Sequence, residues 1–313
     1  MNWLVTGGCG FIGVNFIKNL VEEGGHHIKV LDDFSFGKKE DLAEVCDIYT
    51  DVGLYEGPLE DAEKMDNICK NVDVIVHLAA KSGVRESVLY PDVWFNSNVV
   101  GTFNLLEAAR KNGVKRVVMA SSSAAVGDCS PPAHEEIPAK PISPYGASKT
   151  FMEAYASAYS YSYGMDTVCL RFSNVYGPHS RRKGSLVAKF VRRLMSGSVF
   201  NIYGDGEQTR DFINVKDLID VLKLCVTTDK SIGGEVFQLC SGKEFSVNEV
   251  VSKILQHFPE FDKTKSVNHI DPKPGDMKTN WADNTKIKTM LEWEPKIDFD
   301  DGLKETIDWF KGR

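Results

Sequence analysis

The chain contains 313 residues, of which 42% are hydrophobic and 26% are charged, with 26 glycines and 12 prolines. This composition is that of a globular protein, and it excludes collagen-like, low-complexity and disordered chains. The length exceeds the size at which a single core usually stops growing, so we expect one large domain or two interlocked ones. With 44 acidic against 37 basic residues, the formal net charge is −7. We therefore expect no nucleic-acid partner and no attraction to an anionic membrane surface.

The cysteines and the amino-terminal segment bear on the cellular compartment. The seven cysteines are scattered and form no C-x-x-C pair, which favours reduced thiols over disulfides or a zinc site. The first eight residues hold no basic residue and no long apolar run, so we expect no secretory signal. No apolar run approaches the roughly 20 residues of a membrane-spanning helix. The sequence thus predicts a cytoplasmic protein without a metal site.

Short apolar runs alternate with amphipathic, helix-length segments in the first half of the chain. The expected strands are residues 3–6, 28–32, 74–78, 117–121 and 167–172, and the expected helices are 10–23, 62–71, 90–111 and 144–163. Such alternation is typical of parallel strands joined by crossover helices. Beyond residue 171, loops rich in Gly, Arg and Pro separate shorter elements, with helices expected at 246–258 and 302–310.

These patterns predict an α/β fold, with a Rossmann-type doubly wound parallel sheet and a smaller α/β substrate-binding cap. We expect residues 1–170 to form the Rossmann domain. Residues 171–313 are expected to form mainly the substrate-binding domain, with some segments returning to the first domain. Ligands of such folds bind at the carboxyl ends of the strands, so the polar residues at these ends are the candidates for a site.

Glycines at positions 7, 10 and 13 follow the first expected strand and open the first expected helix. Glycine there permits a tight turn and the close approach of a pyrophosphate, which the amino terminus of the helix attracts. Asp32 ends the second strand, 19 residues after Gly13, where a carboxylate can accept both hydroxyls of an adenosine ribose. Asp32 and the adjacent Asp33 would repel a 2′-phosphate. The pattern therefore predicts a dinucleotide site that prefers NAD to NADP.

A second pattern places a phenol, an ammonium and hydroxyls near each other. Tyr145 and Lys149 are four residues apart at the start of an expected helix and so share one helix face. A phenol acts as a base near neutral pH only if its anion is stabilised, and an adjacent cation does this. Ser121, Ser122 and Ser123 end another strand, where one hydroxyl could share a hydrogen bond with the substrate hydroxyl that Tyr145 deprotonates.

Eight motifs, spread over essentially the whole chain, resemble in order and spacing the extended short-chain dehydrogenases/reductases of the nucleotide-sugar epimerase and dehydratase family. They are TGGCGFIG, HLAAKSGV, NSNVVGTFNLLEAA, SSS, SPYGASK, RFSNVYGP, GDGEQTRDFINVKD and PGDMKTNWAD. The resemblance implies an NAD cofactor, a nucleotide-sugar substrate and a homodimer. The dimer interface would be a four-helix bundle built from the helix with Asn98 and the helix with Tyr145 of each copy.

The residues of this sequence that match the family's motifs, together with those identified above, form three sets. The catalytic set is Ser123, Tyr145 and Lys149. The expected NAD-binding set is Gly7, Gly10, Phe11, Ile12, Gly13, Asp32, Asp33, Asp51, Val52, Leu78, Ala79, Ala80, Lys81, Asn98, Ser121, Tyr145, Lys149 and Phe172. The expected substrate-binding set is Ser123, Tyr145, Asn174, Arg210, Lys273, Asp276 and Asn280. Among the last set, Arg210 offers a bidentate fork to a diphosphate.

The residues after Ser123 bear on the type of reaction. Dehydratases of the family typically have an acidic residue after this serine or threonine, whereas this chain has Ala124 and Ala125. The sequence therefore predicts epimerisation at C4 through a transient 4-keto sugar. A 4,6- or 5,6-dehydratase stays an alternative, because Glu86 or Glu135 could supply the acid. The segment SSSAAVGD also lacks the tyrosine that the family usually has in V-Y-G. This leaves open which of Ser121, Ser122 and Ser123 assists catalysis.

Other residues bear on the substrate and on alternative functions. Asn280 stands where hexose-restricted UDP-galactose 4-epimerases carry a bulky aromatic residue, so UDP-N-acetylhexosamines are expected to be accepted alongside UDP-hexoses. The basic run at residues 181–183, formed by Arg181, Arg182 and Lys183, is interpreted as a solvated loop. If an arginine of this run turned inward, a UDP-glucuronate 4-epimerase would be the alternative. An NAD-binding regulator, or a dehydrogenase with exchangeable NAD, would use the same fold.

Overall fold

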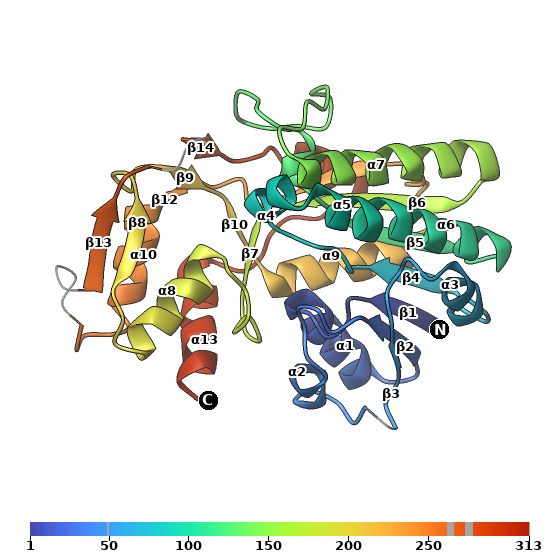
Figure 1. Cartoon of the computed structure of the whole chain (residues 1–313), viewed down its shortest axis with the longest axis horizontal. Helices are drawn as coiled ribbons and strands as arrows, with labels where there is room; N and C mark the ends of the chain where they lie inside the picture. The colour runs from blue at the N-terminus through green and yellow to red at the C-terminus, as the bar shows by residue number, and fades with distance from the viewer. Residues whose placement is uncertain (49, 262–265, 273–277, 313) are drawn as a thin grey trace. The chain divides into compact units, whose positions relative to one another are not determined.

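The computed structural model (Figure 1) describes residues 1–48, 50–261, 266–272 and 278–312. The chain divides into two compact units. The first unit comprises Met1–Cys129, Glu135–Phe172 and Ile219–Gln238, and the second comprises Ser130–His134, Ser173–Leu218 and Leu239–Arg313. Among the described residues, no helix has both the length and the apolar character that crossing a membrane requires.

A seven-stranded sheet forms the centre of the first unit, in the order β11-β6-β5-β4-β1-β2-β3. Its strands are β1 (Asn2–Thr6), β2 (His27–Asp32), β3 (Val52–Glu56), β4 (Val74–His77), β5 (Arg116–Ser122), β6 (Asp166–Phe172) and β11 (Val236–Leu239). The pairings among β1 to β6 are all parallel. The order 3-2-1-4-5-6 is that of a doubly wound Rossmann sheet, so the predicted fold class is confirmed. The strand order reverses between β1 and β4, where such folds bind ligands.

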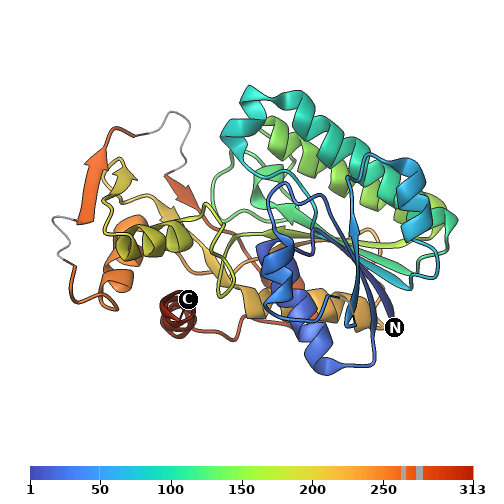
Figure 2. The ribbon, with the colours of Figure 1, turned by 60° about the horizontal axis from the view of Figure 1, so that its bottom comes forward.

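Helices cover both faces of this sheet. They are α1 (Phe11–Glu23), α2 (Lys39–Ala43), α3 (Ala62–Ile68), α4 (Val84–Leu89), α5 (Pro91–Trp94), the π-helix η1 (Phe95–Val100), α6 (Gly101–Lys111), the 3₁₀ helix η2 (Ser123–Ala125) and α7 (Pro144–Tyr163). In Figure 2, α6 and α7 lie on one face of the sheet and α1 on the other. The single helix expected at residues 90–111 is therefore three consecutive elements, with a π-helix in the middle.

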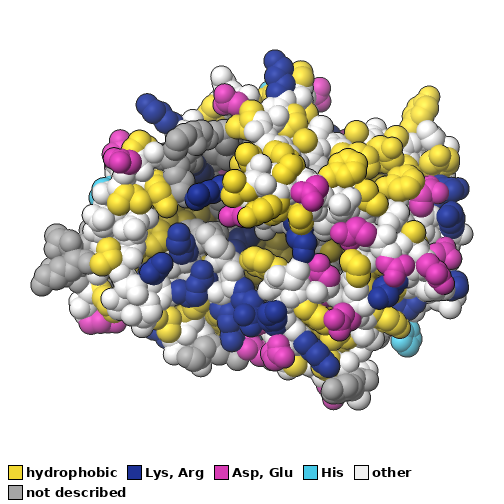
Figure 3. All heavy atoms as spheres, in the orientation of Figure 1, with side chains coloured by type: hydrophobic (Ala, Val, Ile, Leu, Met, Phe, Trp, Pro, Cys, Tyr) yellow, Lys and Arg dark blue, Asp and Glu magenta, His cyan; other side chains and the backbone are white. Residues whose placement is uncertain are grey.

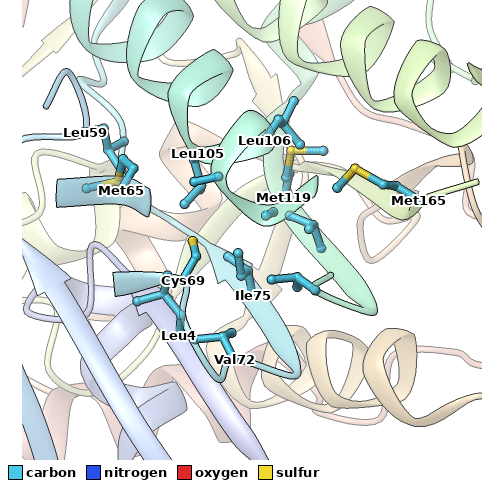
Figure 4. Packing of buried hydrophobic residues seen from close by; sticks show 14 of the residues in the cluster. Leu4, Leu59, Met65, Cys69, Val72, Ile75, Leu105, Leu106, Met119 and Met165 are labelled. Carbon is cyan, nitrogen blue, oxygen red and sulfur yellow. The ribbon is translucent and has the colours of Figure 1, made fainter. Parts of the chain in front are cut away.

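A buried apolar cluster joins the sheet to its helices. Leu4 and Ile75 from the sheet pack with Met65, Leu105 and other apolar residues from α3 and α6 (Figure 4). All four side chains are fully buried. Such close packing fixes the depth at which the carboxyl ends of β1, β4 and β5 lie relative to the helices that follow them.

Local sequence sets the start and end of α7. Pro144 occupies the first turn, where its missing N–H is no loss, and the Ser143 hydroxyl accepts a hydrogen bond from the Gly146 N–H at 3.0 Å. Gly164, with φ of +67°, ends the helix in the left-handed conformation that glycine favours. These signals place Tyr145 in the first turn of the helix and Lys149 one turn later.

The second unit is a smaller α/β assembly. Its strands are β7 (Asn174–Tyr176), β8 (Phe200–Tyr203), β9 (Thr209–Arg210), β10 (Phe212–Asn214), β12 (Phe245–Ser246), β13 (Val267–Ile270) and β14 (Thr279–Asn280). Its helices are α8 (Leu186–Met195), α10 (Val247–Leu255), α12 (Thr285–Leu291) and α13 (Phe299–Lys311), while α9 (Val215–Thr227) contributes residues to both units. Phe190, Phe200, Phe212 and Phe299 are at the centre of its core. Helices α10 and α13 correspond to the two helices expected in this half of the sequence.

Candidate active site

The turn between β1 and α1 is packed so closely against backbone atoms that two of its positions have no room for a side chain. A Cβ atom on Gly7, whose φ is +72°, would lie 2.7 Å from the Ala79 amide nitrogen, and one on Gly13 would lie 2.4 Å from the Gly7 carbonyl oxygen. Gly10 is the N-cap of α1, and among the described residues no side chain caps this terminus. A helix terminus of this kind attracts an anion through its dipole and N–H groups. The residues present therefore fit the pyrophosphate of a dinucleotide, as the sequence led us to expect for Phe11 and Ile12 in the first turn.

Asp32 is fixed at the carboxyl end of β2. Its carboxylate is buried and accepts hydrogen bonds from the Cys9 N–H and the Phe34 N–H, both at 2.9 Å. Burial raises the pKa of Asp32, and these two hydrogen bonds act in the opposite direction. The carboxylate is thus held beside the glycine turn, where a ribose hydroxyl can reach it.

The neighbouring Asp33 forms a small ionic cluster with a residue that follows β4. The Lys81 ammonium donates to the Asp33 carboxylate at 3.1 Å and to the Ser35 hydroxyl at 2.5 Å. Burial acts to raise the pKa of Asp33, but hydrogen bonds from Ser35 and Lys81 hold it below its usual value. The structure therefore brings together two residues that are 48 positions apart and that were both expected near the cofactor.

Asn98 connects the segment after β4 to α7. Its side chain accepts from the Lys81 N–H at 2.8 Å and donates to the Lys81 carbonyl and to the Ser148 hydroxyl, each at 3.0 Å. Asn98 lies in the π-helix η1 and is buried. Leu78, Ala79 and Ala80 follow β4 directly, and the Ala79 N–H donates to the Thr6 hydroxyl at 3.3 Å. This network holds the segment 78–81 alongside the glycine turn.

Tyr145 and Lys149 lie together at the carboxyl end of β5. The Lys149 ammonium is buried, donates to the Ala120 carbonyl at 2.7 Å, and lies 5.9 Å from the centre of the Tyr145 ring. Burial lowers the pKa of Lys149 to about 8. Burial raises the pKa of Tyr145, whereas a hydrogen bond with Ser122 lowers it. The structure thus supplies a phenol with a cation nearby and a hydroxyl in contact.

The three consecutive serines have different partners. Ser121 is buried and donates to the Glu153 carboxylate at 2.5 Å. The Ser122 hydroxyl accepts from the Ala124 N–H at 3.2 Å and is the serine that hydrogen-bonds Tyr145. Ser123 begins the 3₁₀ helix η2, and its catalytic role stays a prediction. Phe172, expected near the cofactor, ends β6 in register with Ser122 and is buried.

Two residues of the expected NAD-binding set lie at the wrong end of their strand. Val52 is the first residue of β3 and pairs with Ile28, and Asp51 precedes it, whereas Glu56 ends β3 and pairs with Asp32. At about 3.3 Å per residue, the start of β3 is roughly 13 Å from the end that it shares with Asp32. The prediction for Asp51 and Val52 is therefore wrong, because no strand had been recognised in this segment and its carboxyl end could not be located.

The second unit brings two of the expected substrate residues side by side. Arg210 in β9 pairs in register with Asn280 in β14. The Asn174 amide donates to the Asp211 carbonyl at 3.0 Å, which places it one residue along from Arg210. Lys273 and Asp276 lie outside the described residues. The basic run 181–183 is tied to α8, because the Arg192 guanidinium donates to the Arg181 and Lys183 carbonyls at 2.5 and 2.8 Å.

Sequence reasoning missed several buried polar residues. Glu153 and Arg171 form a buried bidentate pair, with contacts of 2.8 and 2.9 Å. Asp211 is buried and accepts from Ser241 and Gly242 N–H groups, each at 2.8 Å. A signal existed for each member of the first pair separately, since Glu153 follows Lys149 by one helical turn and Arg171 interrupts an apolar strand.

Known proteins resemble this chain over its whole length. Residues 4–306 match the family described as GDP-mannose 4,6 dehydratase. A UDP-glucose 4-epimerase from Thermotoga maritima, solved with UDP-glucose, is 35% identical with a TM-score of 0.90, over 100% of this chain and 99% of its own. A UDP-N-acetylglucosamine 4-epimerase from Methanobrevibacter ruminantium, solved with UDP-N-acetylmuramic acid, is 32% identical with a TM-score of 0.91, over 99% and 98%. A dTDP-glucose 4,6-dehydratase from Streptomyces venezuelae, solved with NAD, is 31% identical with a TM-score of 0.91, over 100% and 97%.

The glycine turn generates a direct test. In Gly13→Ala the new Cβ meets only backbone atoms, at 2.4 to 2.8 Å, so neither partner can move aside cheaply. We expect a loss of about 2 kcal/mol or more, seen as a melting temperature lower by about 5 °C, together with loss of bound dinucleotide. Gly184→Ala is the control, because no atom lies within 4 Å of its added Cβ. Equal stability and dinucleotide content in the two variants would contradict this view of the turn.

Proposed function

Since the chain belongs to the GDP-mannose 4,6-dehydratase family of extended short-chain dehydrogenases/reductases, we propose that it is an NAD-dependent nucleotide-sugar 4-epimerase. The observation that carries the proposal is the group formed by Tyr145, Lys149 and the serines at the end of β5, without a carboxylate in η2. The proposed substrate is a UDP-hexose or a UDP-N-acetylhexosamine. The first unit binds NAD and the second unit binds the nucleotide sugar, and the reaction takes place in the cytoplasm.

The cofactor-binding residues of the first unit fit NAD. The glycine turn and the amino terminus of α1 would hold the pyrophosphate, and Asp32, fixed by the Cys9 N–H, would accept hydrogen bonds from the adenosine ribose. The carboxylates of Asp32 and Asp33 disfavour the extra phosphate of NADP. The chemistry supplied by NAD, when bound, is reversible hydride transfer at C4 of the sugar.

The protein's own residues handle the proton. Tyr145 removes the proton of the C4 hydroxyl while C4 is oxidised to the ketone, and it returns a proton to the same oxygen afterwards. Lys149 stabilises the phenolate, because its ammonium lies close to the ring in a buried environment. Ser122 or Ser123 holds the sugar oxygen in line with the phenol. Inversion requires that the 4-keto sugar turns over before C4 is reduced again from its other face.

The absence of an acid in η2 favours epimerisation over dehydration. Elimination of water needs an additional group that removes the C5 proton or protonates the leaving hydroxyl, and Ala124 and Ala125 supply neither. Glu135, considered above as a substitute acid, accepts a hydrogen bond from the Gln238 N–H at 2.7 Å. That contact engages its carboxylate with β11. Glu86 is exposed in the first turn of α4.

Residues of the second unit bind the substrate in this proposal. Arg210 provides a guanidinium for the diphosphate, and Asn174 lies beside its strand. Asn280 pairs with Arg210, and a side chain smaller than an aromatic one would leave room there for the 2-acetamido group of a UDP-N-acetylhexosamine. A related enzyme solved with a UDP-N-acetylamino sugar supports this substrate range.

Product analysis tests the reaction and the substrate. The purified protein is incubated with UDP-glucose, UDP-N-acetylglucosamine, UDP-glucuronate and dTDP-glucose, and products are identified by NMR. We expect C4 epimers of the first two and no product that has lost water. A 4-keto-6-deoxy product would replace the proposal with a dehydratase, and turnover of UDP-glucuronate alone would replace it with a uronate epimerase. Failure of UDP-N-acetylglucosamine where UDP-glucose reacts would refute only the role given to Asn280.

The Tyr145 hydroxyl supplies a second prediction. Tyr145→Phe removes the base but keeps the ring, so the melting temperature should change by less than about 2 °C. Removal of a positioned acid/base group is expected to lower kcat about 10²- to 10⁴-fold, measured with the nucleotide sugar that reacts best. Ser160→Ala, farther along the same helix, is the control and should keep wild-type kcat. Activity within tenfold of wild type in Tyr145→Phe would show that another group is the base.

We also propose a homodimer formed by the helices on one face of the first unit. Phe95 and Phe103 are 57% and 41% exposed, and hydrophobic side chains gather over α5 and α7 in Figure 3. A groove of about 510 Å³ on this face is lined by Phe95, Val99, Phe151 and neighbouring residues. Contiguous apolar surface of this kind is typical of an interface between proteins.

The dimer predicts the effect of a charge placed in that surface. Phe95→Arg should convert the protein to a monomer, because an unpaired cation would be buried between the copies. Val199→Arg is the control, since Val199 lies in the second unit and is 49% exposed. Light scattering coupled to size exclusion measures both masses. A wild-type monomer, or a dimer that persists in Phe95→Arg, would contradict the proposed interface.

A further inference from the structure

Strands β5 and β6 are joined by an arginine clamp at each end. At the amino end, Arg116 pairs with Asp166, with a contact of 2.6 Å from its Nε, and its Nη1 donates to the carbonyls of Cys225 and Thr228 at 2.7 and 2.9 Å. At the carboxyl end, Arg171 pairs with Glu153 and Glu153 accepts from Ser121. The register places Arg116 opposite Asp166 and Ser121 opposite Arg171. Only the second clamp reaches the site described above.

The clamp at the carboxyl end includes helix α7, whereas the clamp at the amino end does not. Glu153 belongs to α7, one helical turn after Lys149 and two turns after Tyr145. Its Oε1 accepts from both Ser121 and Arg171, and its Oε2 accepts from Arg171. One carboxylate therefore fixes the end of β5, the end of β6 and the third turn of α7. The turn with Ser122 and Ser123 follows Ser121 directly, so its distance from Tyr145 depends on this carboxylate.

Glu153 supplies the negative charge near the buried Lys149 ammonium. Lys149, Glu153 and Arg171 are all buried. His77 from β4 is neutral, because burial lowers its pKa to about 3, and Cys169 from β6 is a neutral thiol, because burial raises its pKa. Among the residues that the structure describes, Tyr145 is the remaining titratable group beside the ammonium. Glu153 is thus the one carboxylate among these six groups, and it pairs with Arg171 and lies one helical turn from Lys149.

We propose that Glu153 is a positioning residue for the reaction: its carboxylate orients the Ser122–Ser123 turn through Ser121, and its charge keeps Lys149 an ammonium beside Tyr145. The inference rests on the proposed function, in which Tyr145 is the base. It assigns to Glu153 no contact with substrate or cofactor.

The electrostatic part of the proposal has a definite sign. Burial lowers the pKa of Lys149 to about 8, and the charge of Glu153 acts against this. Lys149 is charged below its pKa and neutral above it, so activity that needs the ammonium falls as the pH rises through that value. Replacing Glu153 by the nearly isosteric neutral Gln moves this alkaline limit to lower pH. Replacing Arg171 by Gln removes a competing cation and moves the limit to higher pH.

The experiment measures the pKa of Lys149 directly and the pH profile of kcat in parallel. Lysines labelled with ¹³C at Cε are titrated by NMR in the full-length protein with its bound cofactor, and the Lys149 signal is identified by its loss in Lys149→Arg. In Glu153→Gln the pKa of Lys149 is expected to fall by about one unit or more, with kcat at least about tenfold lower. In Arg171→Gln the pKa of Lys149 rises. In Glu153→Asp, which retains the charge, the alkaline limit of the kcat profile is expected to match that of the wild type.

Asp166→Asn supplies the matched control, because it breaks the clamp at the other end of the same two strands. It is expected to lower stability but to leave the pKa of Lys149 and the pH profile unchanged. The proposal is overturned if Glu153→Gln leaves the Lys149 titration in place, or if Asp166→Asn shifts it equally. Should Glu153→Gln fail to fold, a Lys149 pKa that does not rise in Arg171→Gln overturns the proposal, because Arg171 is the cation that shares the Glu153 carboxylate. Because the titration does not depend on turnover, a wild-type protein without epimerase activity refutes the proposed function while the Lys149 result still stands.

Discussion

The hydrogen bond from the buried Lys149 ammonium to the Ala120 carbonyl is the contact on which the site depends. A buried ammonium without hydrogen-bond partners is very unfavourable, so this contact fixes the position of α7 against the carboxyl end of β5. Tyr145 lies on the same helix one turn earlier, and the place of its ring beside the Lys149 ammonium follows from that docking. The cap on Ser143 and the proline at the first turn set the start of the helix, and thereby the depth of the phenol.

The other residues of the first unit reach the site because the strands are parallel. The carboxyl ends of β1, β2, β4 and β5 lie at one edge of the sheet. Thr6 and His77 end β1 and β4 in register and are joined by a hydrogen bond of 2.7 Å between their side chains. Asn98 adds a connection between the segment after β4 and the start of α7. Few of these contacts are local in sequence, so the site forms only when the whole sheet has formed.

The fold class and much of this site could be predicted from the sequence. The alternation of apolar strands and helices predicts the fold class, which the structure confirms. The same alternation places the glycine turn directly after β1 and Asp32 at the end of β2. Asp51 and Val52 were misplaced because β3 has an exposed, weakly patterned sequence that gave no strand signal. Glu153 and Arg171 could not be paired beforehand, because helix spacing gives the face of a residue but not the strand against which that face packs. The π-helix at residues 95–100 was also missed, since it differs from an α-helix only in its hydrogen-bond pattern.

The central claim is that the chain inverts C4 without chemistry at C5 or C6. In an epimerase of this kind the hydrogen removed from C4 returns to the same carbon, whereas elimination of water exchanges the C5 hydrogen with solvent. The most direct measurement is turnover in D₂O followed by NMR of the nucleotide sugar. The account predicts products with protium at C4, C5 and C6, and deuterium at C5 or C6 would contradict it.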